Sequence, residues 1–352
     1  MRARRLAAVG VVGALLLAPT ARADGHGHNG KEHGHRGHGD QGQGHQGQGH
    51  HGAGDGGRGG ERFPDTGPFA PLDRTGPALS PSPAALARSL ACTGDLVHRH
   101  PVLLVPGTTL DPSEFRWNYL RSLPAAGYAV CTVTLPQHAL GDIQVSGEYV
   151  LNAIRQVHAR SGQQVAVVGH SQGGMVPQWA LRLWPDVRPM VSDLVGLAPS
   201  NHGTVDSQAL CQASCPPAFW QQAAPARFLQ ALNSGVETFR GISYTDVYTR
   251  ADEVVVPNAD STGSSSLHTG PGAVRNIALQ DVCPTDASEH LAIGTYDAVA
   301  YALVLDALAH RGPADPARVP AAVCHASQSV SQSVSQSVSQ SVIDPTQSRR
   351  RY

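Results

Sequence analysis

The sequence predicts an α/β fold, with a mainly parallel central sheet and helices on both faces. Short apolar runs that end at Gly or Pro turns alternate with longer amphipathic stretches, which is the pattern of consecutive strand–helix units. A serine flanked by glycines stands between one such run and a helical stretch. Six cysteines in a chain that begins with an export signal further predict a disulfide-bonded domain.

The apolar runs predict six strands, at residues 100–105, 128–134, 164–168, 191–197, 242–249 and 274–279. Helical periodicity predicts helices at residues 115–123 and 147–160, a helix from the serine motif to residue 183, and a long helix at 291–310. Asp297 and Asp306 lie inside the last of these. They favour a buried core helix over a membrane span, because charged groups are costly inside a bilayer.

The first 23 residues have the features of a secretory signal. Arg2, Arg4 and Arg5 give a positive start, residues 6–18 are apolar, and Ala21-Arg22-Ala23 is a small-x-small cleavage site. We therefore expect a secreted, extracellular protein that is cleaved after Ala23.

Both flanks of the predicted domain have biased composition. Residues 24–83 are rich first in Gly, His and Gln and then in Pro, and we expect a disordered spacer followed by an extended lead-in. Residues 326–352 include four copies of Ser-Gln-Ser-Val, which predict a low-complexity tail. The domain itself is expected at residues 84–325. Weak metal binding is an alternative role for the spacer, through His26, His28, His33, His35 and His38.

The overall charge excludes one class of function. Lys and Arg number 26 and Asp and Glu number 27, so the formal net charge is −1. A chain without an excess of basic residues lacks the electrostatic footprint of a nucleic-acid-binding protein. We expect no nucleic-acid partner.

The segment Gly169-His170-Ser171-Gln172-Gly173 is a Gly-x-Ser-x-Gly motif between a predicted strand and a predicted helix. Glycines permit the sharp turn that such a junction needs, and the turn exposes the serine hydroxyl above the sheet. Ser171 is the predicted nucleophile. His170 is expected to pack against the neighbouring turns.

A serine nucleophile needs a base, and the base needs an acid that orients it. When this motif begins the triad, the acid and then the histidine follow later strands. Asp252 follows the strand at 242–249, and His290 follows the strand at 274–279. Asp252 is the predicted acid and His290 the predicted base. Their rivals by position were Glu253, Asp246 and Asp260 for the acid, and His202 and His268 for the base.

The reaction at an ester carbonyl passes through an oxyanion, which donors aimed at its oxygen stabilise. The backbone N–H of Gln172, directly after the nucleophile, is one predicted donor. The other is Thr108 in the turn Pro106-Gly107-Thr108, which follows the first strand and offers both an N–H and a hydroxyl.

Together these segments resemble the lipase B-like secreted lipases of the α/β-hydrolase family. The resemblance runs from about Cys92 to Cys324. It rests on residues 103–108, 149–154 and 171–174, on Ala198-Pro199, on residues 203–205 and 220–222, and on Ala251-Asp252-Glu253. It implies an α/β-hydrolase fold, a triad of Ser171, Asp252 and His290, and an oxyanion hole at Thr108 and Gln172.

The cysteines alone allow fifteen pairings, although the short spacing of Cys211 and Cys215 suits a small loop. The resemblance implies the pairs Cys92–Cys131 and Cys283–Cys324 and leaves Cys211–Cys215 as an addition near the lid region. The sequence departs from the family at Ser200, where the family has an acidic residue after Ala-Pro. We expect a difference in acyl-pocket polarity from this change.

These observations predict a secreted serine lipase or carboxylesterase that acts on acylglycerol-type esters through an acyl-enzyme. We expect an ester or lipid substrate, transient contact with a lipid interface, no cofactor and a monomer. A polyester or cutin hydrolase and an acyltransferase are alternatives, because substrate choice depends on pocket shape. A secreted metal-binding protein that uses the His-rich tract is the alternative outside enzymes.

Overall fold

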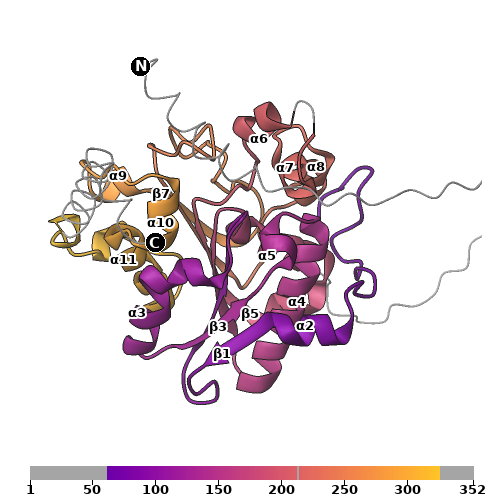
Figure 1. Cartoon of the computed structure of the whole chain (residues 1–352), viewed down its shortest axis with the longest axis horizontal. Coiled ribbons are helices and arrows are strands. Elements are labelled where there is room, and N and C mark those ends of the chain that lie inside the picture. The colour runs from indigo at the N-terminus through magenta and orange to yellow at the C-terminus, as the bar shows by residue number, and fades with distance from the viewer. Residues whose placement is uncertain (1–61, 212–213, 326–352) are drawn as a thin grey trace, which may run out of the picture. The chain divides into compact units, whose positions relative to one another are not determined.

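The computed structural model describes residues 62–211 and 214–325, and the predicted signal, His-rich tract and C-terminal tail lie outside these ranges. In the described ranges, seven strands form one sheet in the order β1-β3-β2-β4-β5-β6-β7 (Figure 1). The strands are β1 (Leu90–Thr93), β2 (Pro101–Val105), β3 (Ala129–Val133), β4 (Val165–His170), β5 (Val191–Leu197), β6 (Ser243–Tyr248) and β7 (Ala273–Ala278). Only β1 pairs antiparallel, with β3.

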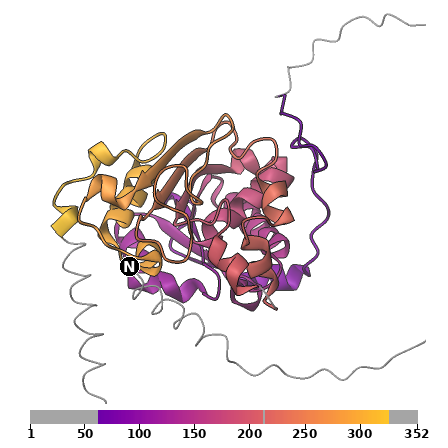
Figure 2. The same cartoon turned by 90° about the horizontal axis from the view of Figure 1, so that it is seen from above.

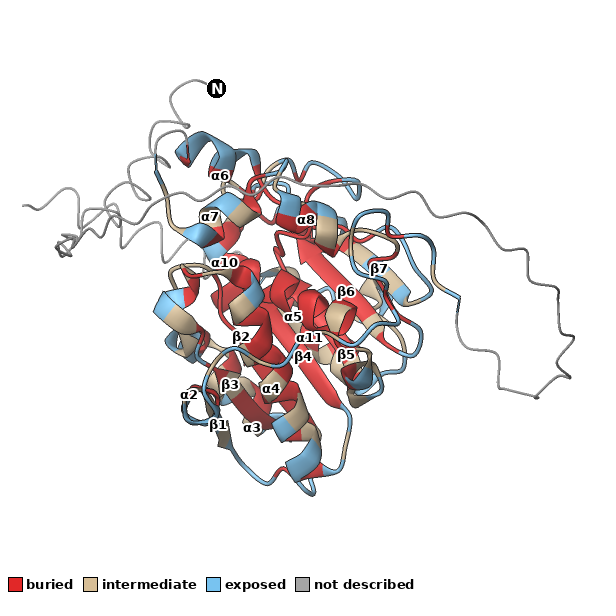
Figure 3. Cartoon of the chain, turned by 90° about the vertical axis from the view of Figure 1, so that its right-hand side faces the viewer, coloured by how far each residue is buried: buried red, intermediate tan, exposed pale blue. Residues whose placement is uncertain are grey.

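The central strands are buried on both faces, as Figure 3 shows for β4, β5 and β6. In β2 every residue is buried, and alternate side chains enter different cores. Val102 and Leu104 belong to one hydrophobic cluster, whereas Leu103 and Val105 belong to the other. Two covered faces explain why these strands read as continuous apolar runs rather than as alternating patterns.

Helices cover both faces of the sheet, as predicted. One core contains side chains from α4 (Ile143–Ser161), α5 (Gln172–Leu183), α7 (Pro217–Gln222) and α8 (Arg227–Leu232). The opposite core contains side chains from α3 (Tyr119–Ala125), α9 (Leu279–Val282), α10 (His290–Thr295) and α11 (Ala298–Ala309). Figure 2 shows α9, α10 and α11 of the second group, in orange and yellow, at the other end of the domain from α7 and α8.

Two predicted helices are divided in the structure. The expected helix at 291–310 is two helices, because Asp297 leaves helical geometry and its carboxylate accepts the N–H of Ala300 to begin α11. The expected helix at 115–123 is a 3₁₀ turn, η1 (Pro112–Trp117), followed by α3 after Asn118. Among the described residues, His290–Ala309 is the one stretch long and apolar enough to cross a membrane, and it is mostly buried inside the domain.

The Pro-rich lead-in packs on the domain. We expected the domain to start at residue 84, whereas the packed segment begins about 20 residues earlier. Leu72 lies in the hydrophobic core, and Phe63 packs edge-on against Phe239 at 6.1 Å between ring centroids. The indole of Trp184 donates to the carbonyl of Pro77 at 3.2 Å. Further donors on the same face bind the lead-in carbonyls, namely Arg182 on Ala70 and Arg188 on Leu72. Described by its contacts, the domain begins near residue 63.

Three disulfides join Cys92 to Cys131, Cys211 to Cys215 and Cys283 to Cys324. The first links the neighbouring strands β1 and β3, and the third fastens the C-terminal segment to the end of α9. The first and third are the pairs that the resemblance implies, and the second is the expected addition. The other elements of the described residues are α2 (Pro83–Ser89), α6 (Val205–Leu210) and the 3₁₀ helices η2 (Pro136–Ala139), η3 (Pro185–Met190) and η4 (Pro316–Arg318).

Candidate active site

Ser171 occupies a sharp turn between β4 and α5. Its backbone has φ 56° and ψ −126°, a conformation that a residue with a side chain adopts at a cost of about 1–3 kcal/mol. The flanking glycines are required by space. A Cβ on Gly169 would lie 1.9 Å from the carbonyl oxygen of Gly173, and one on Gly173 would lie 2.2 Å from that of Val105. The glycines on both sides of Ser171 therefore permit the sharp turn for steric reasons.

Asp252 and His290 meet after β6 and β7. The carboxylate oxygen Oδ2 of Asp252 lies 3.0 Å from Nδ1 of His290. The other oxygen accepts the backbone N–H groups of Val254 at 2.9 Å and Val255 at 2.8 Å. With Nδ1 held by the carboxylate, Nε2 is the ring nitrogen left to accept a proton.

Electrostatics at the base favour its protonated form. Burial lowers the pKa of His290, but the charge and hydrogen bond of Asp252 and the charges of Glu253 and Glu289 together outweigh it. The net pKa is raised from its ordinary value. A base with a raised pKa accepts a proton more readily from a serine hydroxyl.

His170, the residue directly before Ser171, places the predicted nucleophile near the predicted base. The ring of His170 packs against that of His290, with 4.9 Å between centroids. Among the contacts of the described residues there is no side-chain hydrogen bond between Ser171 and His290. The structure thus joins Asp252 to His290 by a hydrogen bond and packs His290 against the residue before Ser171. Catalytic contacts commonly tighten only when substrate binds.

The predicted oxyanion residues lie against the serine. A Cβ on Gly107 would be 3.2 Å from Cβ of Ser171, so the turn before Thr108 contacts the nucleophile. The hydroxyl oxygen of Thr108 accepts the side-chain amides of Gln172 at 2.9 Å and Gln222 at 3.1 Å. These two contacts use both lone pairs of the hydroxyl. Its remaining hydrogen-bonding capacity is its hydrogen, which can donate to a substrate oxygen.

Gln222 is not among the site residues predicted from the sequence. Its amide is oriented by Ser200, whose hydroxyl donates to Oε1 of Gln222 at 2.9 Å. The second amide hydrogen of Gln222 serves the carbonyl of Ala218 within α7 at 3.1 Å. A glutamine on a short helix 114 residues after Thr108 carries no sequence signal for this contact.

The rival residues lie in other surroundings. Asp246 is buried in β6, where its carboxylate accepts from Asn201 at 2.9 Å, and Asp260 holds Thr262 in an exposed loop. His202 and His268 stack on each other with 5.4 Å between ring centroids. Glu253 accepts the backbone N–H of His290 at 3.2 Å and so lies beside the base.

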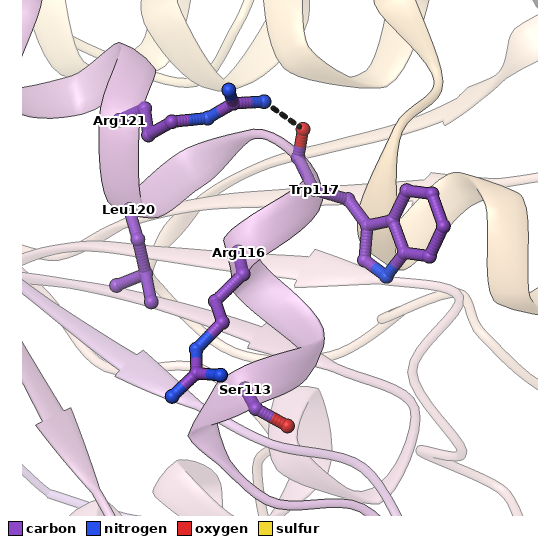
Figure 4. A pocket seen from close by; sticks show the side chains of 5 residues that line it. All are labelled: Ser113, Arg116, Trp117, Leu120 and Arg121. Carbon is purple, nitrogen blue, oxygen red and sulfur yellow. Dashed lines mark hydrogen bonds between the residues drawn. The ribbon is translucent and has the colours of Figure 1, made fainter.

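An open hollow of about 630 Å³ lies on η1 and α3 (Figure 4). Ser113, Arg116, Trp117, Leu120 and Arg121 line it, and Arg121 folds back to donate to the carbonyl of Trp117 at 3.2 Å. None of the predicted catalytic residues lines this hollow, so we do not assign the chemistry to it. Across the described ranges, no cluster of three or more His, Cys, Asp or Glu side chains is arranged to hold a metal ion.

Comparison with known proteins agrees with this geometry. The profile of the Alpha/beta hydrolase family matches residues 102–333. Lipase B from Pseudozyma antarctica is 34% identical over 212 residues, which span 59% of this chain and 61% of that relative. The alignment thus covers less than two thirds of the relative's length. The crystal structure of Aspergillus fumigatus lipase B matches with a TM-score of 0.67 and 31% identity, over 75% of this chain and 67% of that one.

Proposed function

The chain belongs to the alpha/beta hydrolase family, as its sequence predicts, and we propose that it is a serine lipase or carboxylesterase. The observation that carries the proposal is the bond between Asp252 and His290 beside the strained turn of Ser171. The similarity to two fungal lipases named lipase B supports ester hydrolysis as the reaction.

In the proposed reaction, Oγ of Ser171 attacks the ester carbonyl while Nε2 of His290 takes the hydroxyl proton. The protonated imidazole, stabilised by Asp252, then gives this proton to the leaving alcohol as the bond from the carbonyl carbon to the alcohol oxygen breaks. The acyl group remains as an ester on Ser171. Water, deprotonated by His290, attacks this ester, and the proton returns to Ser171 as the carboxylic acid leaves.

The negative oxygen formed in both steps faces three proposed donors. These are the backbone N–H groups of Thr108 and Gln172 and the hydroxyl of Thr108. Gln172 is the first residue of α5, so its N–H has no acceptor within the helix and lies at the positive end of the helix dipole. Donors that are already in place require no reorganisation during the reaction.

Exposed apolar side chains support contact with a lipid surface. Trp117 on η1 is 69% exposed, Trp220 on α7 is 51% exposed and Leu291 on α10, next to the base, is 47% exposed. Their elements follow the carboxyl ends of β2, β5 and β7, which is the edge of the sheet that carries Ser171. Three disulfides and the similarity to lipase B support an extracellular location.

The test is hydrolysis of p-nitrophenyl esters, from acetate to palmitate, and of emulsified triglyceride by the wild type and Ser171→Ala. Rates that rise with chain length, together with triglyceride hydrolysis, would establish a lipase. Activity restricted to the shortest esters would establish a carboxylesterase. Activity that survives in Ser171→Ala would overturn the proposed mechanism.

A further inference from the structure

A buried pair of titratable side chains lies outside the triad and directly beside it. Glu114 on η1 is 3% exposed at its side chain, and His170, the residue before the nucleophile, is 1% exposed. We propose that Glu114 and His170 are positioning residues that hold the oxyanion turn and the catalytic histidine in register. This inference rests on the proposed function, because it concerns the same reaction.

Three hydrogen bonds connect the two halves of the site through this pair. The backbone N–H of Gly107, in the oxyanion turn, donates to Oε1 of Glu114 at 3.1 Å. The other oxygen of Glu114 lies 3.2 Å from Nδ1 of His170. On the far side of the ring, Nε2 of His170 lies 3.0 Å from the backbone carbonyl oxygen of His290. One continuous chain of bonds therefore runs from the turn before Thr108 to the main chain of the base.

The positions of the hydrogen atoms in these three bonds follow from which groups can donate. A carbonyl oxygen can only accept, so Nε2 of His170 carries a hydrogen and donates to His290. The contact between Nδ1 and Glu114 then needs one more hydrogen, either on Nδ1 or on the carboxyl oxygen. The pair is thus an imidazolium with a carboxylate or an imidazole with a carboxylic acid, and all three bonds form in both cases.

The main chain of His290 is held by hydrogen bonds at both its carbonyl oxygen and its N–H. Its carbonyl oxygen receives the bond from His170, and its N–H donates to Oε2 of Glu253 at 3.2 Å. The ring of His170 also fills its space fully, since a Cβ on Gly294 would lie 2.2 Å from it. With its main chain fixed in this way and Nδ1 fixed by Asp252, the imidazole of His290 has little freedom to turn away from Ser171.

Stability alone does not explain a charged or proton-sharing pair at this depth. Removing charged groups from water offsets much of the attraction between them, and apolar residues of similar volume stabilise a core at least as well. A fixed geometry matters more for catalysis, where a displacement of about 1 Å can lower a rate by about 100-fold. The pair also contacts the two segments whose relative position sets the attack distance.

Three variants separate positioning from simple packing. Glu114→Ala removes the acceptor of both Gly107 and His170. Glu114→Gln retains every bond, because its oxygen accepts from Gly107 and its amide donates to Nδ1 of His170. His170→Phe keeps a ring in the same space without either bond. Glu237→Ala is the matched control, because Glu237 is equally buried and its side chain bonds to His202, His268 and Thr269 rather than to a proposed catalytic residue.

We expect Glu114→Ala and His170→Phe each to lower kcat for a short p-nitrophenyl ester by about 10–100-fold with KM changed less than about threefold. Glu114→Gln should remain within about threefold of the wild type, and Glu237→Ala should keep its kcat. The double variant Glu114→Ala with His170→Phe should lose little more than either single variant, since both break one chain of bonds. Rates are expressed per active centre, titrated with a phosphonate ester, so that unfolded protein does not enter kcat.

Equal kcat values in Glu114→Ala and Glu237→Ala would overturn the inference, as would a Glu114→Gln variant as slow as Glu114→Ala. Ser171→Ala is assayed alongside them. If that variant stays active, the proposed function fails. If Ser171→Ala is inactive while Glu114→Ala is unimpaired, only the positioning role fails.

Discussion

At the scale of single residues, the hydroxyl of Thr108 is the donor most open to a direct test. Its oxygen accepts from Gln172 and Gln222, which leaves its hydrogen to donate to the proposed oxyanion. Thr108→Val keeps the shape and removes the donor, and we expect kcat to fall by about 100–1,000-fold with little change in KM. Thr108→Ser, which retains the hydroxyl, is the matched control and should recover most of the rate. Equal rates in the two variants would show that the hydroxyl is not used.

The pH dependence of the base gives a second residue-scale prediction. His290 must be neutral to accept the serine proton, so kcat/KM should fall as the pH drops below the pKa of His290. Carboxylates raise that pKa, and Glu253 is one of them. In Glu253→Gln one charge is lost while the amide oxygen still accepts from the His290 N–H, so the acid limb should move to lower pH.

Profiles of kcat/KM against pH for the wild type, Glu253→Gln and Glu237→Gln measure this shift. The Glu237 variant loses the same charge outside the site and should keep the wild-type midpoint. An acid limb that does not move in Glu253→Gln, or that moves upward, would contradict the electrostatic account of the base.

The sequence reveals only part of the site at this scale. Ser171, Asp252 and His290 can be proposed from the sequence because each follows a recognisable strand and the fold sets the order in which a triad occurs along the chain. Glu114 and Gln222 are not, because their roles depend on contacts with residues 56 and 114 positions away in the chain. His170 was expected only to pack against neighbouring turns, and the polar partners of its ring emerge only in three dimensions.

At the scale of elements, the apolar runs predict the strands well, because a strand buried on both faces has no polar alternation to obscure it. Helix boundaries are less predictable. The run at 291–310 is mostly apolar, and α11 begins at the capping carboxylate of Asp297 inside it. Strand β1 was not predicted. It has four residues at the edge of the sheet, of which every second one is partly buried, so it forms no apolar run.

Strand β5 contains a carboxylate in an unfavourable place. Burial raises the pKa of Asp193 to about 6, against 3.8 in the unfolded chain. The folded state therefore holds a proton more tightly, and stability falls as the pH rises from 3.8 to about 6. Asp193→Asn removes this cost, so we expect a gain of about 1–3 kcal/mol in the free energy of unfolding near pH 8.

Urea unfolding of the wild type and Asp193→Asn at several pH values tests this prediction. The gain should disappear near pH 4, where Asp193 is already largely protonated in the folded state. A variant that is less stable than the wild type near pH 8 would show that the charged carboxylate makes a favourable contact in β5.

At the scale of the whole molecule, the structure assigns the lead-in to the domain. Composition suggested an extended segment outside it, since Pro-rich sequence lacks periodicity. Yet Leu72 is in the core, and Arg182, Trp184 and Arg188 bind carbonyl groups of the segment. These side chains are far along the chain from the lead-in, so the sequence offers no local signal of the docking.

Leu72→Ala measures how much this docking stabilises the molecule. Creating a cavity at a fully buried leucine typically costs about 2–5 kcal/mol, and we expect the free energy of unfolding to fall by that amount. Leu79→Ala, at a half-buried position in the same segment, is the control and should cost clearly less. A decrease in the free energy of unfolding below about 0.5 kcal/mol, as is usual for surface substitutions, would show that docking of the lead-in does not stabilise the domain.

The central claim is that Ser171 forms the acyl-enzyme, and covalent labelling tests it most directly. The protein is treated with a p-nitrophenyl phosphonate ester, and the modified residue is identified by peptide mass spectrometry. The account predicts one label per chain, on Ser171, with release of one equivalent of p-nitrophenol and complete loss of esterase activity. A label on another residue, or full activity after Ser171 has been labelled, would contradict it.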